Sequence, residues 1–239
     1  MIQFFEKLFK GSRADFSAVL KDHLINETRM FLVTANPEIF MKSESDADIA
    51  ALLADNATTI IADGYGIVKG GSMLGYSIPE RIPGVEVAEE LFQLGSAYQK
   101  SVFLLGAKQE VMDKLCEEIA RRFPNLVVCG AVNGYVENKD AVFEEIKVLQ
   151  PDIVLVGLGV PAQEKLIFKH LQDFRKGIFV GVGGSFDVLS ATKRRAPKFF
   201  IDHNLEWLYR LLKEPNRIKR FYESNVKFIF AVRRKMKRK

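Results

Sequence analysis

The feature that most constrains the fold is a repeated alternation of short apolar segments with longer amphipathic ones. Six apolar segments have the length and residue types of β-strands, and helical patterns separate most of them. They span residues 30–34, 58–62, 101–105, 126–129, 153–156 and 178–182. Strands that alternate with helices are typical of a parallel sheet with helices on both faces. We therefore expect an α/β fold with a doubly wound, mainly parallel sheet, and we expect the most hydrophobic segment, 153–156, at its centre.

Composition places the chain among globular proteins. Its 239 residues are 48% hydrophobic and 27% charged, which is enough to bury a full core. The longest apolar stretches are too short to cross a bilayer, and residues 1–6 lack the pattern of a signal peptide. Cys116 and Cys129 have no metal-ligand spacing, so we expect both to be reduced, as in a cytoplasmic protein.

The positive charge is concentrated at the C-terminus. Residues 210–239 carry twelve Lys or Arg and two Glu, whereas the whole chain has a net charge of only +5. A nucleic-acid-binding role for the whole domain is therefore not favoured, and the tail requires an anionic partner or surface. A helix over 218–239 places Ile218, Tyr222, Ile229, Val232 and Met236 on one apolar stripe. An interfacial helix with cationic anchorage fits this pattern best, and an ordinary packing helix or a nucleic-acid arm are the alternatives.

The best candidate for a functional group is Asp63, which directly follows the apolar segment 58–62. Gly64 and Gly66 come next, and glycine allows a sharp turn and the close approach of a ligand. Ligands of open α/β sheets bind at the carboxyl ends of the strands. Asp63 is thus placed as a general base or a ligand anchor, with a plain Asp-Gly turn as the alternative.

Other polar residues follow neighbouring strands. Thr34 and Asn36 offer a hydroxyl and an amide, although the second is also a typical helix cap. Arg81 is positioned to bind a diphosphate, or is simply solvated, and it follows a glycine-rich stretch, 69–79, that we expect to be mobile. Gln163 lies near a helix N-terminus, and Asp187 follows a second glycine-rich strand end. Together these strand ends predict a nucleotide-type cleft.

Two other chemistries are not favoured. The segment 157–159 lacks the third glycine of a dinucleotide fingerprint, so no nicotinamide or flavin cofactor is expected. Asp46 and Asp48 have the spacing of a metal-binding pair, but they lie at a predicted helix start, where carboxylates favour the helix dipole. The sequence therefore predicts neither a cofactor nor a metal.

Several motifs, in order over about residues 30–222, resemble the WecG/TagA/CpsF glycosyltransferases. They are Thr34-Ala35-Asn36-Pro37-Glu38, Ala62-Asp63-Gly64, Glu80-Arg81, Pro161-x-Gln163-Glu164, Gly181-Val182-Gly183-Gly184-x-Phe186-Asp187, Arg195-Ala196-Pro197, Leu205-Glu206-Trp207-Leu208-Tyr209-Arg210 and Glu214-Pro215-x-Arg217. The resemblance implies a Rossmann-like core, residues 1–197, followed by a basic amphipathic helical appendage, residues 198–239, that binds the membrane and closes the active site.

The resemblance also implies a function. Members of this family are inverting, metal-independent enzymes of the inner face of the bacterial plasma membrane, where they are peripheral and cytoplasmic. They transfer N-acetylmannosamine from its UDP form to polyprenyl-diphosphate-linked N-acetylglucosamine, for teichoic acid or surface polysaccharide synthesis. The uronate of N-acetylmannosamine and glucose are alternative donor sugars, and a non-catalytic nucleotide- or membrane-binding adaptor is the alternative function. The implied partners are the donor, the lipid-linked acceptor and an anionic membrane surface, with no nucleic acid and with a homo-oligomer possible.

Carried over to this sequence, the family motifs assign roles to the polar strand ends. Asp63 is similar to the base that deprotonates the acceptor hydroxyl. Thr34, Asn36 and Gln163 correspond to residues that line the sugar and diphosphate site, and Arg81 corresponds to one that meets phosphates.

The remaining roles concern the uridine and the leaving group. Asp187 corresponds to a residue that faces the uridine, and Arg210, Arg217 and Arg220 correspond to appendage residues that close over the site and neutralise the leaving UDP. Two positions depart from the family pattern, since Ala162 replaces the usual Lys and Ser190-Ala191 replace Ala-Gly. Neither departure affects the base.

Overall fold

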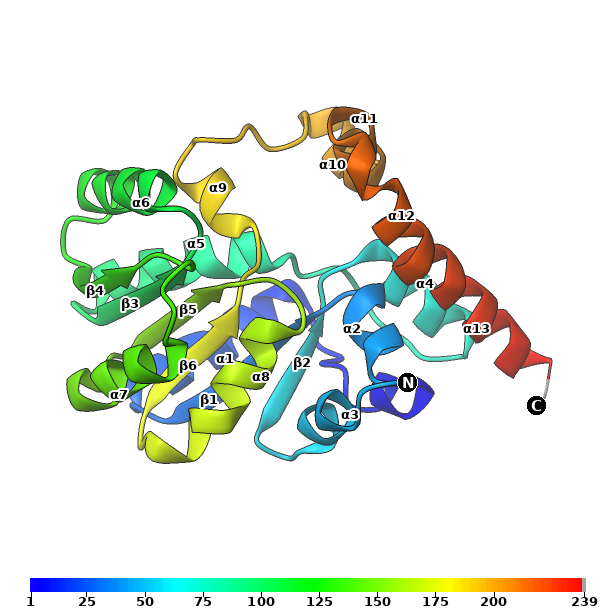
Figure 1. Cartoon of the computed structure of the whole chain (residues 1–239). Helices are drawn as coiled ribbons and strands as arrows, with labels where there is room; N and C mark the ends of the chain where they lie inside the picture. The colour runs from blue at the N-terminus through cyan, green and yellow to red at the C-terminus, as the bar shows by residue number, and fades with distance from the viewer. Residues whose placement is uncertain (238–239) are drawn as a thin grey trace.

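The fold is a six-stranded parallel sheet between two layers of helices, with a further helical segment at its C-terminus (Figure 1). The computed structural model describes residues 1–237, apart from the side chains of Arg210 and Arg217. The strand order is β2-β1-β6-β5-β3-β4, and every pairing is parallel. The strands are β1 (Arg29–Ala35), β2 (Thr58–Ala62), β3 (Ser101–Gly106), β4 (Val127–Val132), β5 (Ile153–Gly157) and β6 (Gly177–Gly181). The predicted α/β fold is confirmed.

The two middle strands, β5 and β6, are apolar along their whole length because both of their faces are covered. In β5, Val154 and Val156 belong to one core cluster, while Ile153 and Leu155 belong to the cluster on the opposite face. Alternate side chains of a strand point to opposite faces, so a strand that is covered on both faces has a nearly continuous apolar sequence instead of an alternating one. β5 and β6 occupy the middle of the sheet, as expected for segment 153–156.

The helices divide between the two faces. One face carries α1 (Arg13–Ile25), α5 (Gly84–Ala97), α6 (Gln109–Arg122) and α9 (Ser185–Leu189). The other carries α2 (Pro37–Lys42), α3 (Ala47–Ala54), α7 (Lys139–Leu149) and α8 (Ala162–His170). Short 3-10 turns, η1 (Ile2–Phe5) and η2 (Leu171–Asp173), also contribute to the second face. Helices on both faces make the sheet doubly wound.

The Asp46-Ala47-Asp48 segment begins a helix, as its helix-start interpretation predicted. Asp46 caps α3, because its side chain accepts hydrogen bonds from the backbone N–H groups of Asp48 and Ile49. Both carboxylates also lie 2.8 Å from the ammonium of Lys165. Their spacing is thus explained by capping and ion pairing.

The glycine-rich stretch after β2 is partly helical, which the sequence did not predict. α4 (Tyr65–Met73) runs through Gly70 and Gly71, although glycine weakens a helix. A Cβ on Gly70 would lie 2.8 Å from the Phe228 ring, and one on Gly71 would lie 2.3 Å from Ile78 Cδ1. The two glycines therefore allow close packing that offsets their low helix propensity.

The C-terminal segment folds into a series of helical elements, the last of which follow one another without a gap from Ile218 to Met236, within the predicted helix 218–239. The elements are α10 (Lys198–Asp202), α11 (Glu206–Lys213), η3 (Pro215–Arg217), α12 (Ile218–Phe221), a π-helical turn η4 (Tyr222–Val226) and α13 (Lys227–Met236). In Figure 1 this segment, orange to red, follows α9 and leads down to α4 and α2. α13 packs against both α4 and α2.

The apolar stripe expected along this segment is divided. Val232 is buried together with Phe228, whereas Ile218, Tyr222 and Met236 are exposed. The π-helical turn shifts the rotation of the chain between the two parts, so one continuous stripe does not form.

Candidate active site

The candidate site lies at the carboxyl ends of four adjacent strands, β2, β1, β6 and β5. Ala35 of β1 pairs with Ala62 of β2, so Asn36 and Asp63 emerge next to each other. The Asp63 N–H donates to the Ala35 carbonyl at 2.9 Å, which extends the pairing by one residue. The edge of the sheet thus brings together polar residues that are about thirty positions apart in sequence.

Asp63 lies at the N-terminus of a helix. Its Oδ1 accepts a hydrogen bond of 3.2 Å from the backbone N–H of Gly84, the first residue of α5. Ile82 donates to the Ala62 carbonyl at 2.8 Å and holds the start of α5 against the end of β2. The first N–H groups of a helix carry a partial positive charge, so the start of α5 is a favourable partner for an acidic side chain.

Gly64 and Gly66 permit a close approach between two loops. A Cβ on Gly64 would lie 3.0 Å from Pro37 Cδ, and one on Gly66 would lie 2.7 Å from Pro37 Cγ. The glycines after Asp63 therefore let the β2 loop pack onto the loop after β1.

Thr34 and Asn36 both have structural contacts. Thr34 is buried, and its Oγ1 donates to the Gly181 carbonyl at 3.0 Å, which ties β1 to the end of β6. Asn36 Oδ1 caps α2 by accepting from the Ile39 N–H at 3.1 Å. The capping interpretation is confirmed for Asn36, and its side-chain NH2 is a separate donor group.

Gln163 bridges the loops after β5 and β6. It is 2% exposed, and its Oε1 accepts from the N–H of Gly159 at 3.0 Å and of Gly183 at 2.9 Å. Both glycines have positive φ, 81° and 51°, a region that other residues rarely adopt. Its Nε2 donates to Glu164 Oε1 at 2.8 Å. The prediction that Gln163 lies at a helix N-terminus is correct, since α8 begins one residue earlier.

Glu164 is the most deeply buried carboxyl group near this edge. It is 1% exposed, and burial raises its pKa from 4.5 to about 7, with a smaller contribution from the nearby charge of Glu38. Glu164 Oε2 has no hydrogen-bond partner among the described residues.

Two ion pairs connect the C-terminal segment with the candidate site. Arg81 Nη2 lies 3.2 Å from Glu206 Oε2 of α11, and both side chains are mostly buried. Arg220 of α12 binds Glu38 of α2 through Nε and Nη2, at 3.0 and 2.8 Å from Oε2. Because Glu38 lies in the first turn of α2, this second pair places Arg220 beside the helix that follows β1.

Asp187 is in the first turn of α9, after β6. Its Oδ1 lies 3.5 Å from Lys193 Nζ, and its backbone carbonyl accepts from the Lys193 N–H at 2.8 Å. The other two predicted residues, Arg210 and Arg217, belong to α11 and η3, but their side chains lie outside the described part of the structure.

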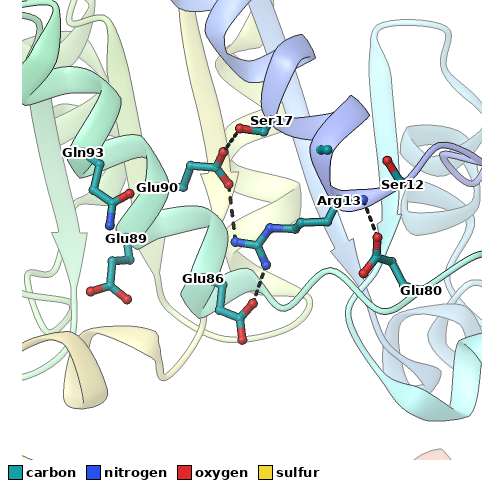
Figure 2. A pocket seen from close by; sticks show the side chains of 9 residues that line it. Ser12, Arg13, Ser17, Glu80, Glu86, Glu89, Glu90 and Gln93 are labelled. Atoms are coloured by element: carbon teal, nitrogen blue, oxygen red, sulfur yellow. Dashed lines mark hydrogen bonds and ion pairs between the residues drawn. The ribbon is translucent and has the colours of Figure 1, made fainter. Parts of the chain in front are cut away.

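A separate hollow of about 550 Å³ lies between α1 and α5 (Figure 2). Four glutamates line it, and Arg13 points between Glu86 and Glu90 to pair with both. Arg195 and Arg122 pair with Glu86 and Glu89. An ion-pair network thus stabilises the walls of the hollow. Its carboxylates would repel a diphosphate, which is also negatively charged.

One cluster has the geometry to hold a metal ion. Possible ligand atoms of Glu144, His170 and Asp173 lie within 4.8 Å of one another. Lys147 forms ion pairs with two of these residues, with its Nζ 3.8 Å from Glu144 and 3.6 Å from Asp173, and so partly neutralises their negative charge. The cluster lies at the C-terminal end of α8, whereas the candidate site lies at its N-terminal end.

Sequence reasoning assigned no role to Glu38, Glu164 or Glu206. Each belongs to one of the motifs quoted above, so its position was visible in the sequence. Their importance depends on burial and on partners from distant segments, which local patterns do not reveal.

Comparison with known proteins agrees with this arrangement. The model of the glycosyl transferase WecG/TagA/CpsF family matches residues 5–239. Three relatives are each named N-acetylglucosaminyldiphosphoundecaprenol N-acetyl-beta-D-mannosaminyltransferase. The one from Bacillus spizizenii is 39% identical, with 84% of this chain and 78% of the relative covered. The one from Bacillus subtilis is 36% identical (86% and 80% covered), and the one from Staphylococcus aureus strain MW2 is 38% identical (80% and 75% covered). A parallel sheet with its polar residues at the carboxyl edge, and a family match over nearly the whole chain, lead to one assignment: the chain belongs to the WecG/TagA/CpsF family of glycosyltransferases.

Proposed function

We propose that this glycosyltransferase moves N-acetylmannosamine from UDP-N-acetylmannosamine to polyprenyl-diphosphate-linked N-acetylglucosamine, a step in teichoic acid or surface polysaccharide synthesis. The names of three relatives, which are 36–39% identical to this chain, support this choice of sugar and acceptor. The uronate of N-acetylmannosamine and glucose are the donors to test next.

The proposed mechanism is based on the position of Asp63. It follows a buried strand, and its carboxylate meets the Gly84 N–H at the start of α5. In the proposed reaction Asp63 takes the proton of the acceptor hydroxyl, and the hydroxyl oxygen attacks the anomeric carbon. The bond from that carbon to the UDP oxygen breaks as the new one forms, so UDP leaves with its electron pair and the configuration inverts.

The residues around Asp63 are proposed to position the donor. Thr34 and Gln163 shape the site by holding the ends of β1, β5 and β6. We propose that the Asn36 amide contacts the sugar, that Arg81 binds the phosphates and that Asp187 faces the uridine.

The appendage, residues 198–239, is proposed to close over the core, residues 1–197. Its contacts with the core include the Arg81–Glu206 and Glu38–Arg220 ion pairs. Arg220 therefore reaches the edge of the proposed site, and Arg210 and Arg217 belong to the same segment. We propose that these three arginines together neutralise the negative charge that develops on the leaving UDP.

The appendage is also the proposed membrane-binding surface. Among residues 1–237, no helix is both long and apolar enough to cross a membrane. Phe199, Trp207, Leu212, Ile218, Tyr222 and Phe230 are exposed on the appendage, within a strongly basic segment. Exposed aromatic and basic side chains together favour the surface of an anionic membrane. We propose peripheral binding at the inner face of the plasma membrane, where the lipid-linked acceptor is presented.

The test is acceptor-dependent release of UDP from UDP-N-acetylmannosamine, with EDTA present. Wild type is compared with Asp63→Asn and with a control, Asp113→Asn, which changes an exposed aspartate of α6. We expect Asp63→Asn to lower kcat by about 10²–10⁴-fold while UDP binding is retained, because an amide cannot accept the proton.

Two results would count against the proposal. If Asp63→Asn loses UDP affinity and keeps kcat, Asp63 is a binding residue and not the base. If the wild type releases no UDP from any of the three UDP-sugars in the presence of acceptor, the proposed reaction is wrong.

A further inference from the structure

Gln163 and Glu164 form a buried polar pair beneath the candidate site. Three hydrogen bonds of 2.8 to 3.0 Å link it to Gly159, to Gly183 and within the pair itself. Both side chains are almost completely buried, at 2% and 1% exposure. Buried polar groups are costly unless they have a defined partner, so the two side chains depend on these hydrogen bonds.

The contacts determine how the Gln163 amide is oriented. Its oxygen faces two backbone N–H donors, so its NH2 group must face away from them, toward an acceptor. Glu164 Oε1 is that acceptor. A rotated amide would place NH2 against two N–H groups and leave those buried donors without acceptors, which is unfavourable.

Strand β6 leaves room for the Gln163 amide because it ends on a glycine. A Cβ on Gly181, the last residue of β6, would lie 2.6 Å from Gln163 Nε2 and 2.9 Å from its Cδ. The Gln163 side chain therefore lies directly on the β6 backbone, next to the carbonyl that accepts the Thr34 hydroxyl. Movement of the amide would move the ends of β5 and β6 relative to each other.

We propose that Glu164 is a positioning residue for the transfer reaction: its carboxyl group fixes the Gln163 amide and, through that amide, the loops after β5 and β6. This inference depends on the proposed function, which places Gln163 in the site for the sugar and diphosphate. Glu164 itself is not assigned a contact with substrate.

The charge on Glu164 matters for this role. Its second oxygen is buried without a partner among the described residues, and burial raises its pKa to about 7. Glu38 of α2 adds a like charge, although it is paired with Arg220, and the neighbouring Lys165 is engaged by Asp46 and Asp48 of α3. The uncharged acid can still accept the Gln163 hydrogen bond, and it adds no negative charge beside a bound diphosphate. We therefore expect the KM for the donor to rise as the pH rises above about 7.

The test compares two variants of Glu164 with a matched control. Glu164→Gln keeps an acceptor for the Gln163 amide but cannot ionise, whereas Glu164→Ala removes the acceptor. Glu110→Ala is the control, since Glu110 also follows a glutamine in the first turn of a helix, α6, but is exposed. Two readouts are used: kcat and donor KM from about pH 6 to about pH 8.5, and amide hydrogen exchange at Gly159 and Gly183 without substrate.

We expect Glu164→Ala to lower kcat/KM by about 10- to 100-fold, as a small misplacement of reacting groups can do. Exchange at Gly159 and Gly183 should become faster in the same variant. Glu164→Gln should retain wild-type exchange and kcat, and its donor KM should no longer change between pH 6 and 8.5. Glu110→Ala should behave as wild type throughout.

Other results would overturn the inference. Wild-type activity and exchange in Glu164→Ala would show that the carboxyl group fixes nothing. A Glu164→Gln variant with normal exchange but at least tenfold lower kcat would show that the carboxyl group acts on the substrate directly. If Glu164→Ala does not fold, the activity and pH profile of Glu164→Gln decide the question. If the wild type transfers no sugar, the proposed function fails, but the exchange data still show whether Glu164 holds the two loops.

Discussion

Arg81 Nη2 lies 3.2 Å from Glu206 Oε2, so an arginine at the start of the α5 segment pairs with a carboxylate 125 residues later in the chain. The exposed fractions of the two side chains are only 16% and 9%. The arginine that we assign to the substrate phosphates therefore has a partner from the appendage. If Arg81 binds the substrate phosphates as proposed, diphosphate binding and the position of α11 are linked through one guanidinium.

Substitution Glu206→Gln should loosen the appendage. The amide keeps the shape of the side chain but loses the charge-assisted bond to Arg81, which contributes about 1.5–3 kcal/mol in a partly buried setting. We expect faster hydrogen exchange in residues 206–221, by about tenfold or more, with no change in the strands. Glu223→Gln is the control, because Glu223 is an exposed glutamate of the same segment. Equal exchange in the two variants would show that the ion pair does not hold α11.

Phe228 and Phe230 of α13 should differ strongly in their contribution to stability when each is changed to Ala. Phe228 is fully buried, 6.2 Å from the Phe5 ring centre and against Gly70, whereas Phe230 is 61% exposed. Phe228→Ala should lower the free energy of unfolding by about 3–5 kcal/mol, measured by chemical denaturation. Phe230→Ala should change stability by less than about 0.5 kcal/mol.

The Phe230→Ala variant also tests the proposed membrane surface. Sedimentation with anionic vesicles should be weakened about tenfold by Phe230→Ala, since a buried Phe side chain contributes about 1.5–3 kcal/mol. Neutral vesicles provide the control for the basic residues. If Phe230→Ala binds anionic vesicles as tightly as the wild type, α13 does not present Phe230 to the membrane.

Asp152 should contribute stability that is lost in acid. It lies at the amino edge of the sheet, where Ser101 donates to it at 2.8 and 2.9 Å and Lys176 at 2.8 Å. Burial alone raises its pKa, but the bonds from Lys176 and Ser101 outweigh burial and hold the pKa below its ordinary value. A lowered folded-state pKa means that the stabilisation is complete above the unfolded pKa of about 3.9 and is lost as the pH falls through the folded pKa.

Substitution Asp152→Asn should therefore lower the free energy of unfolding by about 1–3 kcal/mol at neutral pH and make it less dependent on pH below about 4. Transfer activity should be retained in the folded protein, because Asp152 lies at the opposite edge of the sheet from Asp63. Asp22→Asn, an exposed aspartate of α1, serves as the control. A pH dependence of stability that matches the wild type would show that Asp152 is not its source.

Most strands could be predicted, but some boundaries and one helix could not. β4 extends to Val132, beyond the predicted 126–129, because Gly130 leaves room for the Phe103 ring, whose Cε2 would be 2.2 Å from a Cβ there. In the same way, α4 passes through Gly70 because Phe228 of the appendage packs on it. Both features depend on contacts between segments that are distant in sequence.

The sequence by itself determined the parallel α/β fold and the position of Asp63, Asn36 and Gln163 at strand ends. These follow from local patterns, since apolar runs, glycines and helix caps act over a few residues. Only the tertiary structure decided which acidic groups matter around them. Glu164 is identified by its burial, and Glu38 and Glu206 by their arginine partners from segments more than 120 residues away. Burial and ion pairing arise only when the whole chain has folded. The free energy of a charged side chain therefore depends more on this three-dimensional environment than on the residues next to it in sequence.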